Sequence, residues 1–317
     1  MGIVKPTRIG LLLAAGALLL GVDATASVIY TFTTLDFSGN PNGINDSDQI
    51  VGSFSDANGI HGFLYSAGVF AVIADPNSPN VTEAYGINDS GQLVGVYNDG
   101  TGNHGFLDTG GTFATIDDPA SVPGNTTAFG INNSGQIVGD FADATGGHGY
   151  LLSGGTFAAI NFPSAPNDFT GAFAIAGSEI AGYFYDSSGT HGFLDASGTF
   201  TELDDPNALP GSTFALGVNV NGEVVGHYAD ATGDHGFVYL NGIYTTLDDP
   251  NALPGNTFAE GINADGEIVG YYNDATGGHP FLAAPAPEPS TWQTATGCIL
   301  VVTAILRKRL AKRVAAT

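Results

Sequence analysis

One pattern of twelve residues occurs six times in this chain, at steps of 43 or 44 residues. It reads Gly-x-aromatic-x-Asp-x-x-Gly-x-His-Gly-aromatic, and Pro280 is the one departure, in place of a Gly after His. The leading glycines are Gly52, Gly95, Gly139, Gly182, Gly226 and Gly270. The aspartates are Asp56, Asp99, Asp143, Asp186, Asp230 and Asp274. The histidines are His61, His104, His148, His191, His235 and His279. A repeat of this length with Gly-His and aromatic marks is typical of propellers and solenoids.

Each repeat predicts four short β-strands separated by Asn-, Asp- and Gly-rich turns. In the second repeat the strands are expected at residues 82–87, 92–97, 104–107 and 112–116. No stretch between residues 27 and 285 has the 3.6-residue period of an amphipathic helix. The sequence therefore predicts an all-β domain with four strands per repeat, which is the unit of a propeller blade.

The sixth repeat lacks its fourth strand, and a matching strand stands at the other end of the domain. Residues 30–36 match residues 198–204 and 242–248, which are fourth strands of their own repeats. We therefore expect a six-bladed β-propeller of four-stranded blades, closed by an N-terminal outer strand that removes the exposed sheet edges. The alternative is an open β-solenoid. The fourth repeat is one residue shorter at residues 173–179, so its first turn should differ from the others.

The features of the two ends divide the chain into three predicted segments. Residues 1–26 predict a secretory signal peptide, because basic residues precede an apolar run that ends in a small-x-small site. Residues 27–284 form the predicted propeller domain, and residues 285–317 a Pro-rich linker, a short apolar helix and a basic end.

The tail resembles the PEP-CTERM sorting signal of bacterial surface proteins. The resemblance rests on Pro287, Glu288 and Pro289, then an apolar run at residues 295–306, then a basic end. The first basic residues of that end are Arg307, Lys308 and Arg309. The resemblance implies processing by an exosortase, transient anchoring by the C-terminal helix, and a final place at the cell surface or in the extracellular matrix. The alternative is a plain C-terminal membrane anchor.

The charges are separated along the chain. All seven Lys and Arg lie before residue 9 or after residue 306, whereas every Asp and Glu except Asp23 and Glu288 lies between residues 27 and 287. Such a domain repels nucleic acid and anionic membranes, because phosphate binding needs Lys and Arg. Contact with a membrane is therefore expected only through the C-terminal segment.

The repeat resembles the bacterial HAF repeat, a family of extracellular repeats named for a His-Ala-Phe mark. The mark here is His-Gly-Phe at residues 61–63, 104–106, 191–193 and 235–237. The segment from Gly261 to Gly270 is also similar to that family. The resemblance implies an exported, repetitive β-domain and transfers no catalytic residue.

The six histidines are expected to be structural, each hydrogen-bonded to the Asp five residues before it. Equivalent positions on six blades lie too far apart to share one metal ion, whose bonds to nitrogen are about 2 Å long. The Asp-rich turns are expected to make ordinary turn contacts on an acidic surface, with calcium, which prefers six to eight oxygen ligands, as the alternative. The candidate calcium ligands are Asp46, Asp48, Asp89, Asp99 and Asp274.

The strand aromatics are expected to pack between blades, and no reactive cluster stands apart from the repeat. The acidic pairs Asp117-Asp118, Asp204-Asp205 and Asp248-Asp249 recur, whereas a catalytic pair normally occurs once. The sequence therefore favours a non-catalytic module at the cell surface or in the extracellular matrix, with polysaccharide or a surface protein as partner. The alternatives are a propeller enzyme that acts on extracellular polysaccharide and a purely structural surface-layer component.

Overall fold

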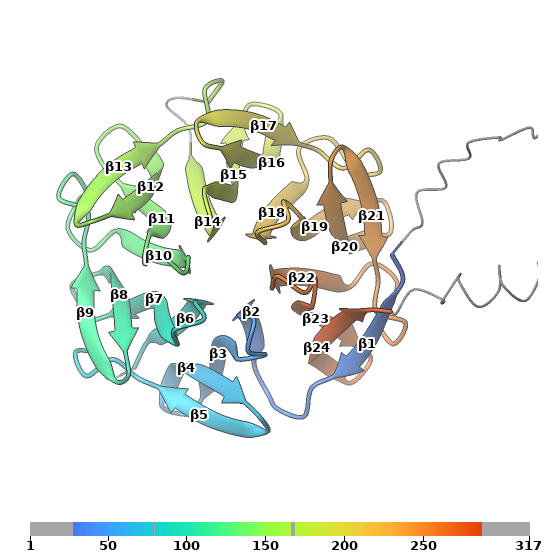
Figure 1. Ribbon diagram of the computed structural model, residues 1–317, viewed down its shortest axis with the longest axis horizontal. Helices are drawn as coiled ribbons and strands as arrows, with labels where there is room; N and C mark the ends of the chain where they lie inside the picture. The colour runs from blue at the N-terminus through green and yellow to red at the C-terminus, as the bar shows by residue number, and fades with distance from the viewer. Residues whose placement is uncertain (1–27, 79, 166–168, 287–317) are drawn as a thin grey trace, which may run out of the picture.

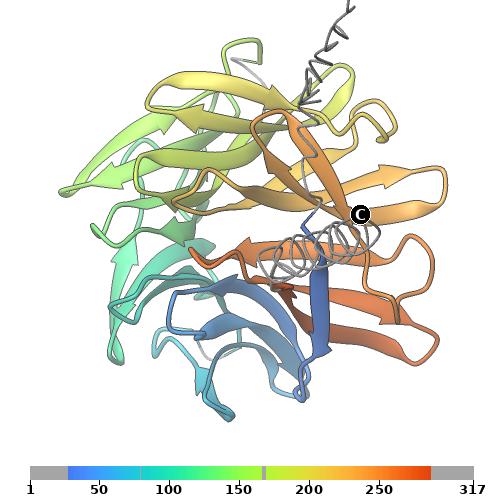
Figure 2. The same ribbon diagram turned by 45° about the vertical axis from the view of Figure 1, so that its right-hand side comes forward.

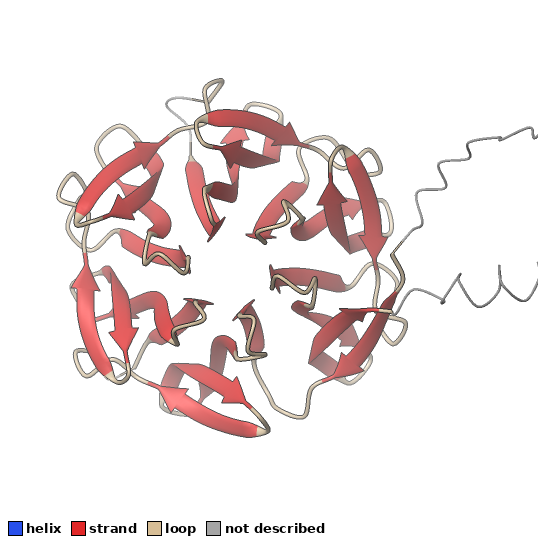
Figure 3. Cartoon of the chain, viewed as in Figure 1, coloured by secondary structure: helices blue, strands red, loops and turns tan. Residues whose placement is uncertain are grey.

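The computed structural model describes residues 28–78, 80–165 and 169–286, and these form six four-stranded antiparallel sheets around one axis (Figures 1 and 3). Every regular element of this described part is a strand. The prediction of an all-β, six-bladed propeller is confirmed. The predicted signal peptide and the sorting residues Pro287, Glu288, Pro289, Arg307, Lys308 and Arg309 lie outside the described residues.

We call the strands of each blade a to d from the axis outward. Blade 1 contains β2 (Asn40–Ile44), β3 (Ile50–Asp56), β4 (Gly59–Ser66) and β5 (Val69–Ile73). Blade 2 contains β6 (Thr82–Ile87), β7 (Gln92–Asn98), β8 (Asn103–Thr109) and β9 (Thr112–Ile116). Blade 3 contains β10 (Thr126–Ile131), β11 (Ile137–Ala142), β12 (Gly147–Ser153) and β13 (Thr156–Ile160).

The remaining blades repeat this plan. Blade 4 contains β14 (Thr170–Ala176), β15 (Glu179–Asp186), β16 (Gly189–Ala196) and β17 (Thr199–Leu203). Blade 5 contains β18 (Thr213–Val218), β19 (Val224–Asp230), β20 (Gly233–Leu240) and β21 (Ile243–Leu247). Blade 6 contains β22 (Thr257–Ile262), β23 (Ile268–Asp274), β24 (Gly277–Pro285) and, as its outer strand, β1 (Tyr30–Thr34). The predicted strands of the second repeat agree with β6 to β9 to within two residues at each end.

The ring closes through β1 and β24, which pair antiparallel from Tyr30 opposite Pro285 to Thr34 opposite Phe281. Figure 2 shows β1 lying against the last blade. Backbone hydrogen bonds extend the seam at both ends, from Leu35 N to Pro280 O at 2.9 Å and from Ala286 N to Ile29 O at 2.6 Å. The open-solenoid alternative is therefore wrong, and β24 runs one residue past the boundary predicted at residue 284.

Blade 4 makes its first turn differently, as its shorter sequence predicted. Ala176 pairs directly with Glu179, so only two residues connect β14 to β15, and the first of them, Gly177, has φ 57°. In blade 2 the same connection is longer, because Ile87 pairs with Leu93.

Every a strand carries a β-bulge that explains the leading glycine of the repeat. In blade 2, Ala84 pairs with Gly95 and Gly86 with Val94, so Tyr85 is the extra residue. The bulge brings the carbonyl oxygen of Glu83 to 1.9 Å from where a Cβ on Gly95 would lie, and the Phe106 ring to 2.8 Å. The other five leading glycines meet the same two obstacles or the carbonyl alone, so only glycine fits.

The hydrophobic core lies between neighbouring blades. The aromatic residue that follows each His-Gly or His-Pro pair is fully buried, with 0% exposure at Phe63, Phe106, Tyr150, Phe193, Phe237 and Phe281. One cluster joins Val94 and Ile116 of blade 2 to Ile137 and Phe141 of blade 3, and the other clusters connect blades in the same way. The predicted packing role of these aromatics is confirmed, although Phe54 of the same series is only half-buried.

The a–b turns add polar contacts close to the axis. The Nδ2 of Asn45 donates to Asn88 O at 3.0 Å, and that of Asn88 donates to Asn132 O at 3.2 Å. Asn132, Asn219 and Asn263 make the corresponding bonds to the next blade. Blade 4 lacks this Asn, so the series of bonds is interrupted at the shortened turn.

The bulge can be tested at Gly270. We expect Gly270→Ala to lower the free energy of unfolding by about 3 kcal/mol, because overpacking a tight site forces the backbone to shift. The new methyl group would lie 2.0 Å from Phe258 O and 2.8 Å from the Phe281 ring. Urea unfolding of both proteins measures the difference.

Gly278→Ala is the matched control in the same blade. Its methyl group would meet only Asn273 Oδ1, at 3.2 Å, and the first blade carries Ile60 at this position. An equal loss of stability in the two variants would show that the bulge contact is not the cause.

Candidate functional site

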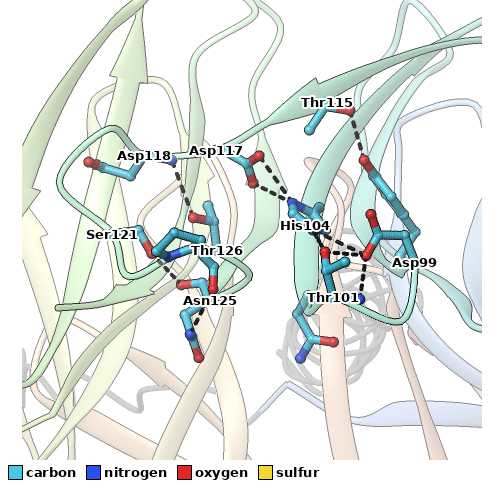
Figure 4. Close-up of polar contacts among 12 residues, drawn as sticks. Asp99, Thr101, His104, Thr115, Asp117, Asp118, Ser121, Asn125 and Thr126 are labelled. Atoms are coloured by element: carbon cyan, nitrogen blue, oxygen red, sulfur yellow. Dashed lines mark hydrogen bonds and ion pairs between the residues drawn. The ribbon is translucent and has the colours of Figure 1, made fainter. Parts of the chain in front are cut away.

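The repeated His and Asp form a hydrogen-bonded network within each blade, shown for blade 2 in Figure 4. His104 Nε2 lies 3.5 Å from Asp99 Oδ1, and its Nδ1 lies 2.9 Å from Asp117 Oδ1. Thr101 Oγ1 donates to Asp99 Oδ1 at 2.6 Å, and the His104 ring stacks on Tyr97. The network ties the b–c turn to the outer strand.

The other five blades repeat the Asp–His contact at 3.1 to 3.4 Å. His191 and His235 also contact an outer Asp, Asp204 and Asp248, and His148 contacts Asn161 instead. The six histidines therefore lie apart, one per blade. The predicted hydrogen bond to the earlier Asp is present at His61, His148 and His279, whereas the other three histidines bond to the Thr or Ser of the b–c turn.

These contacts favour the ionised aspartates. Hydrogen bonds from the Thr or Ser two residues later, and then the His, lower the pKa of Asp99, Asp186 and Asp230. The same causes lower the pKa of Asp143 and Asp274 to about 2. At Asp56 the lowering comes first from the Asn58 backbone N–H and then from His61.

The five predicted calcium ligands do not form one group. Asp46, Asp48 and Asp89 lie at or beside the a–b turns, whereas Asp99 and Asp274 lie in b–c turns near the opposite mouth of the channel. Asp46 Oδ1 accepts from Ala264 N at 2.8 Å, and Asp89 Oδ1 accepts from Asp46 N at 3.0 Å, so both carboxylates join blades. Calcium at these residues stays a prediction.

In the described part of the chain, one group of three side chains could offer its ligand atoms to a metal ion within 4.8 Å of one another. The group consists of His191, Glu202 and Asp204. Glu202 occupies a place where blades 2, 5 and 6 have a Thr that contacts a Tyr hydroxyl, as Thr115 contacts Tyr97 at 2.9 Å. Blade 4 has Phe184 in place of that Tyr, and Glu202 lies 3.6 Å from His191 Nδ1. Two of the three side chains are exposed.

The bulge residues line the centre of the channel, one from each blade. Together they enclose an axial cavity of about 120 Å³. They are Asn42, Tyr85, Phe129, Phe173, Leu216 and Glu260. They share no residue type except Phe, so the six blades differ in chemistry at this position.

Eight aromatic rings form a continuous arc of ring contacts from blade 2 to blade 6, along and between the blades. The first three are bulge residues of the axial cavity, and the next five come from strands a and b nearer the d–a loops. Successive ring centroids lie 4.3 to 5.2 Å apart. In order, this aromatic arc consists of Tyr85, Phe129, Phe173, Tyr183, Phe214, His227, Phe258 and Tyr271. All eight are half-buried, unlike the fully buried aromatics between the outer strands.

Two carboxyl groups that do not recur in the repeat accompany the arc. Burial raises the pKa of Glu260 in the axial cavity to about 8. Burial also raises the pKa of Asp140 to about 6, beside a second cavity of about 210 Å³ between blades 3 and 4. His227 within the arc is neutral at pH 7, because burial lowers its pKa to about 4, and its Nδ1 has no partner in the described residues.

Sequence reasoning singled out the recurring residues and missed the arc. The sequence signal that could have shown the bulge residues is their variation. The residue before each Gly-Ile-Asn or its equivalent differs between most of the repeats. His227 falls outside the recurring His series, and its ring contacts with Phe214 and Phe258 join residues of two blades.

In the part of the chain that the structure describes, no helix has the length and apolar character to cross a membrane. The predicted C-terminal apolar helix lies outside this part.

Glu260 should make stability depend on pH. An unfolded Glu ionises near pH 4.3, whereas folded Glu260 keeps its proton up to about pH 8. The native state therefore holds a proton that the unfolded chain has lost, and stability should fall as the pH rises from 6 to 8. Asp140 acts in the same direction, but mainly between pH 4 and 6.

We expect Glu260→Gln to flatten the slope of unfolding free energy between pH 6 and 8, and Asp36→Asn, at an exposed site of the same blade, to leave it unchanged. Chemical unfolding at several pH values measures the slope. A Glu260→Gln slope parallel to that of the natural protein would contradict the assignment.

Calcium at the Asp turns predicts that EDTA lowers the melting temperature and that millimolar calcium restores it, because a ligand of the native state stabilises it. Asp274→Asn should reduce the difference. A melting temperature that is equal in EDTA and in calcium would leave the turn hydrogen bonds as the only role of these aspartates.

No protein-family model matches this chain. No curated protein matches it either. Solved structures similar to it include a mutant of AofleA from Arthrobotrys oligospora, with 11% identity over 79% of this chain and 85% of that one, at a TM-score of 0.47. The β-propeller domain of the Trilobed protease from Pyrococcus furiosus is 9% identical over 79% of this chain and 80% of that one, at a TM-score of 0.49. A putative gluconolactonase is 15% identical over 82% of this chain and 94% of that one, at a TM-score of 0.48.

Proposed function

We propose that this protein is an exported, non-catalytic propeller that binds polysaccharide at the bacterial cell surface or in the extracellular matrix. Export and processing by an exosortase rest on the two ends of the sequence, through their resemblance to sorting signals. The binding role rests on the channel.

The aromatic arc is the observation that carries this proposal. Three of its eight half-buried rings line the axial cavity, and the other five continue the series of contacts along and between the blades. Contiguous half-buried apolar surface of this kind is typical of a binding site. A pyranose ring has an apolar face of C–H groups that stacks on aromatic side chains, while its hydroxyl groups need hydrogen-bonding partners. Asp140, Glu83 and the amide of Asn42 lie beside the rings and supply such partners.

A surface protein is the other partner that the sequence suggests. Its docking would use the loops of either mouth, whereas a narrow axial channel suits a chain of sugar rings better than a folded surface. The arc therefore favours polysaccharide.

The arc can be tested at Phe214. We expect Phe214→Ala to weaken binding to the host's extracellular polysaccharide roughly fivefold, because one aromatic contact contributes about 1 kcal/mol. Retention of the purified full-length protein on immobilised polysaccharide measures the change.

Ile243→Ala is the control in the same blade, since it removes apolar surface from an exposed position of the outer strand. Equal losses in both variants would show that the arc is not the binding surface. No retention of the natural protein would count against polysaccharide and in favour of a protein partner or self-assembly into a surface layer.

A second candidate function is an enzyme that acts on the same polysaccharide. It is favoured by Glu260 and Asp140, two carboxyl groups outside the repeat whose raised pKa values suit a general acid. Release of reducing ends by the natural protein, abolished in Glu260→Gln, would establish it. Unchanged polymer length after prolonged incubation would leave binding alone.

A further inference from the structure

The axial cavity places one carboxyl group opposite aromatic rings. Blade 6 lies across the axis from blade 3, so Glu260 is on the opposite wall from Phe129, whose neighbours on either side are Tyr85 and Phe173 (Figure 1). The Phe129 and Phe173 rings stack at 4.3 Å, and Tyr85 meets Phe129 at 5.0 Å. Leu216 and Asn42 complete the wall beside Glu260.

Glu260 makes no side-chain hydrogen bond and no ion pair with any described residue. The domain cannot supply a cation for it, because residues 27–287 contain no Lys or Arg. A half-buried carboxyl group without a protein partner favours its protonated form unless it pairs with a ligand cation. The cavity therefore has one polar requirement that the protein itself leaves unmet.

An organic ammonium group meets this requirement. It can donate hydrogen bonds to the Glu260 carboxylate, and aromatic faces on the other side of the cavity attract its charge. The net negative charge of the propeller raises the local concentration of cations and repels polymers that carry carboxylate or phosphate groups. Charge complementarity thus selects one class among the sugars that the arc could stack on.

We propose that the axial cavity binds the protonated amine of an amino-sugar residue, with Glu260 as its acceptor, and that the ligand is a polysaccharide with free amino groups. This inference rests on the proposed binding of polysaccharide at the aromatic arc. The arc provides the stacking contacts common to all pyranose rings, and Glu260 provides the discrimination for the amine over a hydroxyl or an N-acetyl group.

The test compares three oligosaccharides of equal length and linkage with the full-length protein. These are a β-1,4-linked glucosamine tetramer, its fully N-acetylated counterpart and the corresponding glucose tetramer. We expect the glucosamine tetramer to bind about tenfold more tightly than the other two, since a hydrogen bond to a charged group contributes enough for that ratio. Isothermal titration calorimetry measures the three affinities.

Glu260→Gln keeps the shape of the side chain and removes the carboxyl group that could ionise to pair with the ammonium group. We expect this variant to bind the glucosamine tetramer no better than the neutral tetramers, with its affinity for those unchanged. Asp36→Asn, at an exposed position next to β1 of the same blade, removes an equal charge elsewhere and should leave the tenfold preference intact.

The outcomes separate the two proposals. Equal binding of all three tetramers, unaffected by Glu260→Gln, would overturn the amine inference while polysaccharide binding stands. A preference for the glucosamine tetramer that is lost equally in Asp36→Asn would assign it to overall charge and overturn the role of Glu260. Absence of binding to all three, together with no retention on the host's polysaccharide, would overturn both proposals.

Discussion

In every blade the strand nearest the axis contains one residue more than its partner accommodates, and this bulge determines both packing and chemistry. It brings a carbonyl oxygen of strand a so close to strand b that only glycine fits there. This explains Gly95 and its five equivalents. The extra residue itself, such as Tyr85 or Glu260, is turned into the channel. Each blade therefore places one side chain in the channel whose residue type the packing of the repeat does not determine.

The positions that repeat in the blades build the scaffold, whereas the positions that vary between blades form the candidate site. His104 and Asp99 have equivalents in all six blades, whereas the outer contact that His104 makes with Asp117 recurs with an Asp only in blades 4 and 5. The arc residues occupy equivalent positions in only some blades, as Phe214 and Phe258 do, and Glu260 has no acidic equivalent among the other bulge residues. Burial without partners is costly, so a group retained there is best understood through what it binds.

The fold could be predicted from the sequence because its determinants are local or recur at a fixed step. The match of residues 30–36 to other outer strands predicted the seam between β1 and β24, and the spacing of His61 from Asp56 predicted their contact. The arc could not be predicted in this way, because its neighbours, such as Phe129 and Phe173, lie 44 residues apart on separate blades. Their contact depends on blade geometry and on a bulge whose place the strand pattern does not reveal.

The seam between β1 and β24 has a consequence for how the chain is made. β1 is synthesised first and its partner last, and at 5 to 20 residues per second the intervening chain takes roughly 10 to 50 s to appear. During that interval β1 and, later, β24 each present an unpaired edge. Because any copy of β1 fits any copy of β24, two nascent chains that lie close together can exchange this strand.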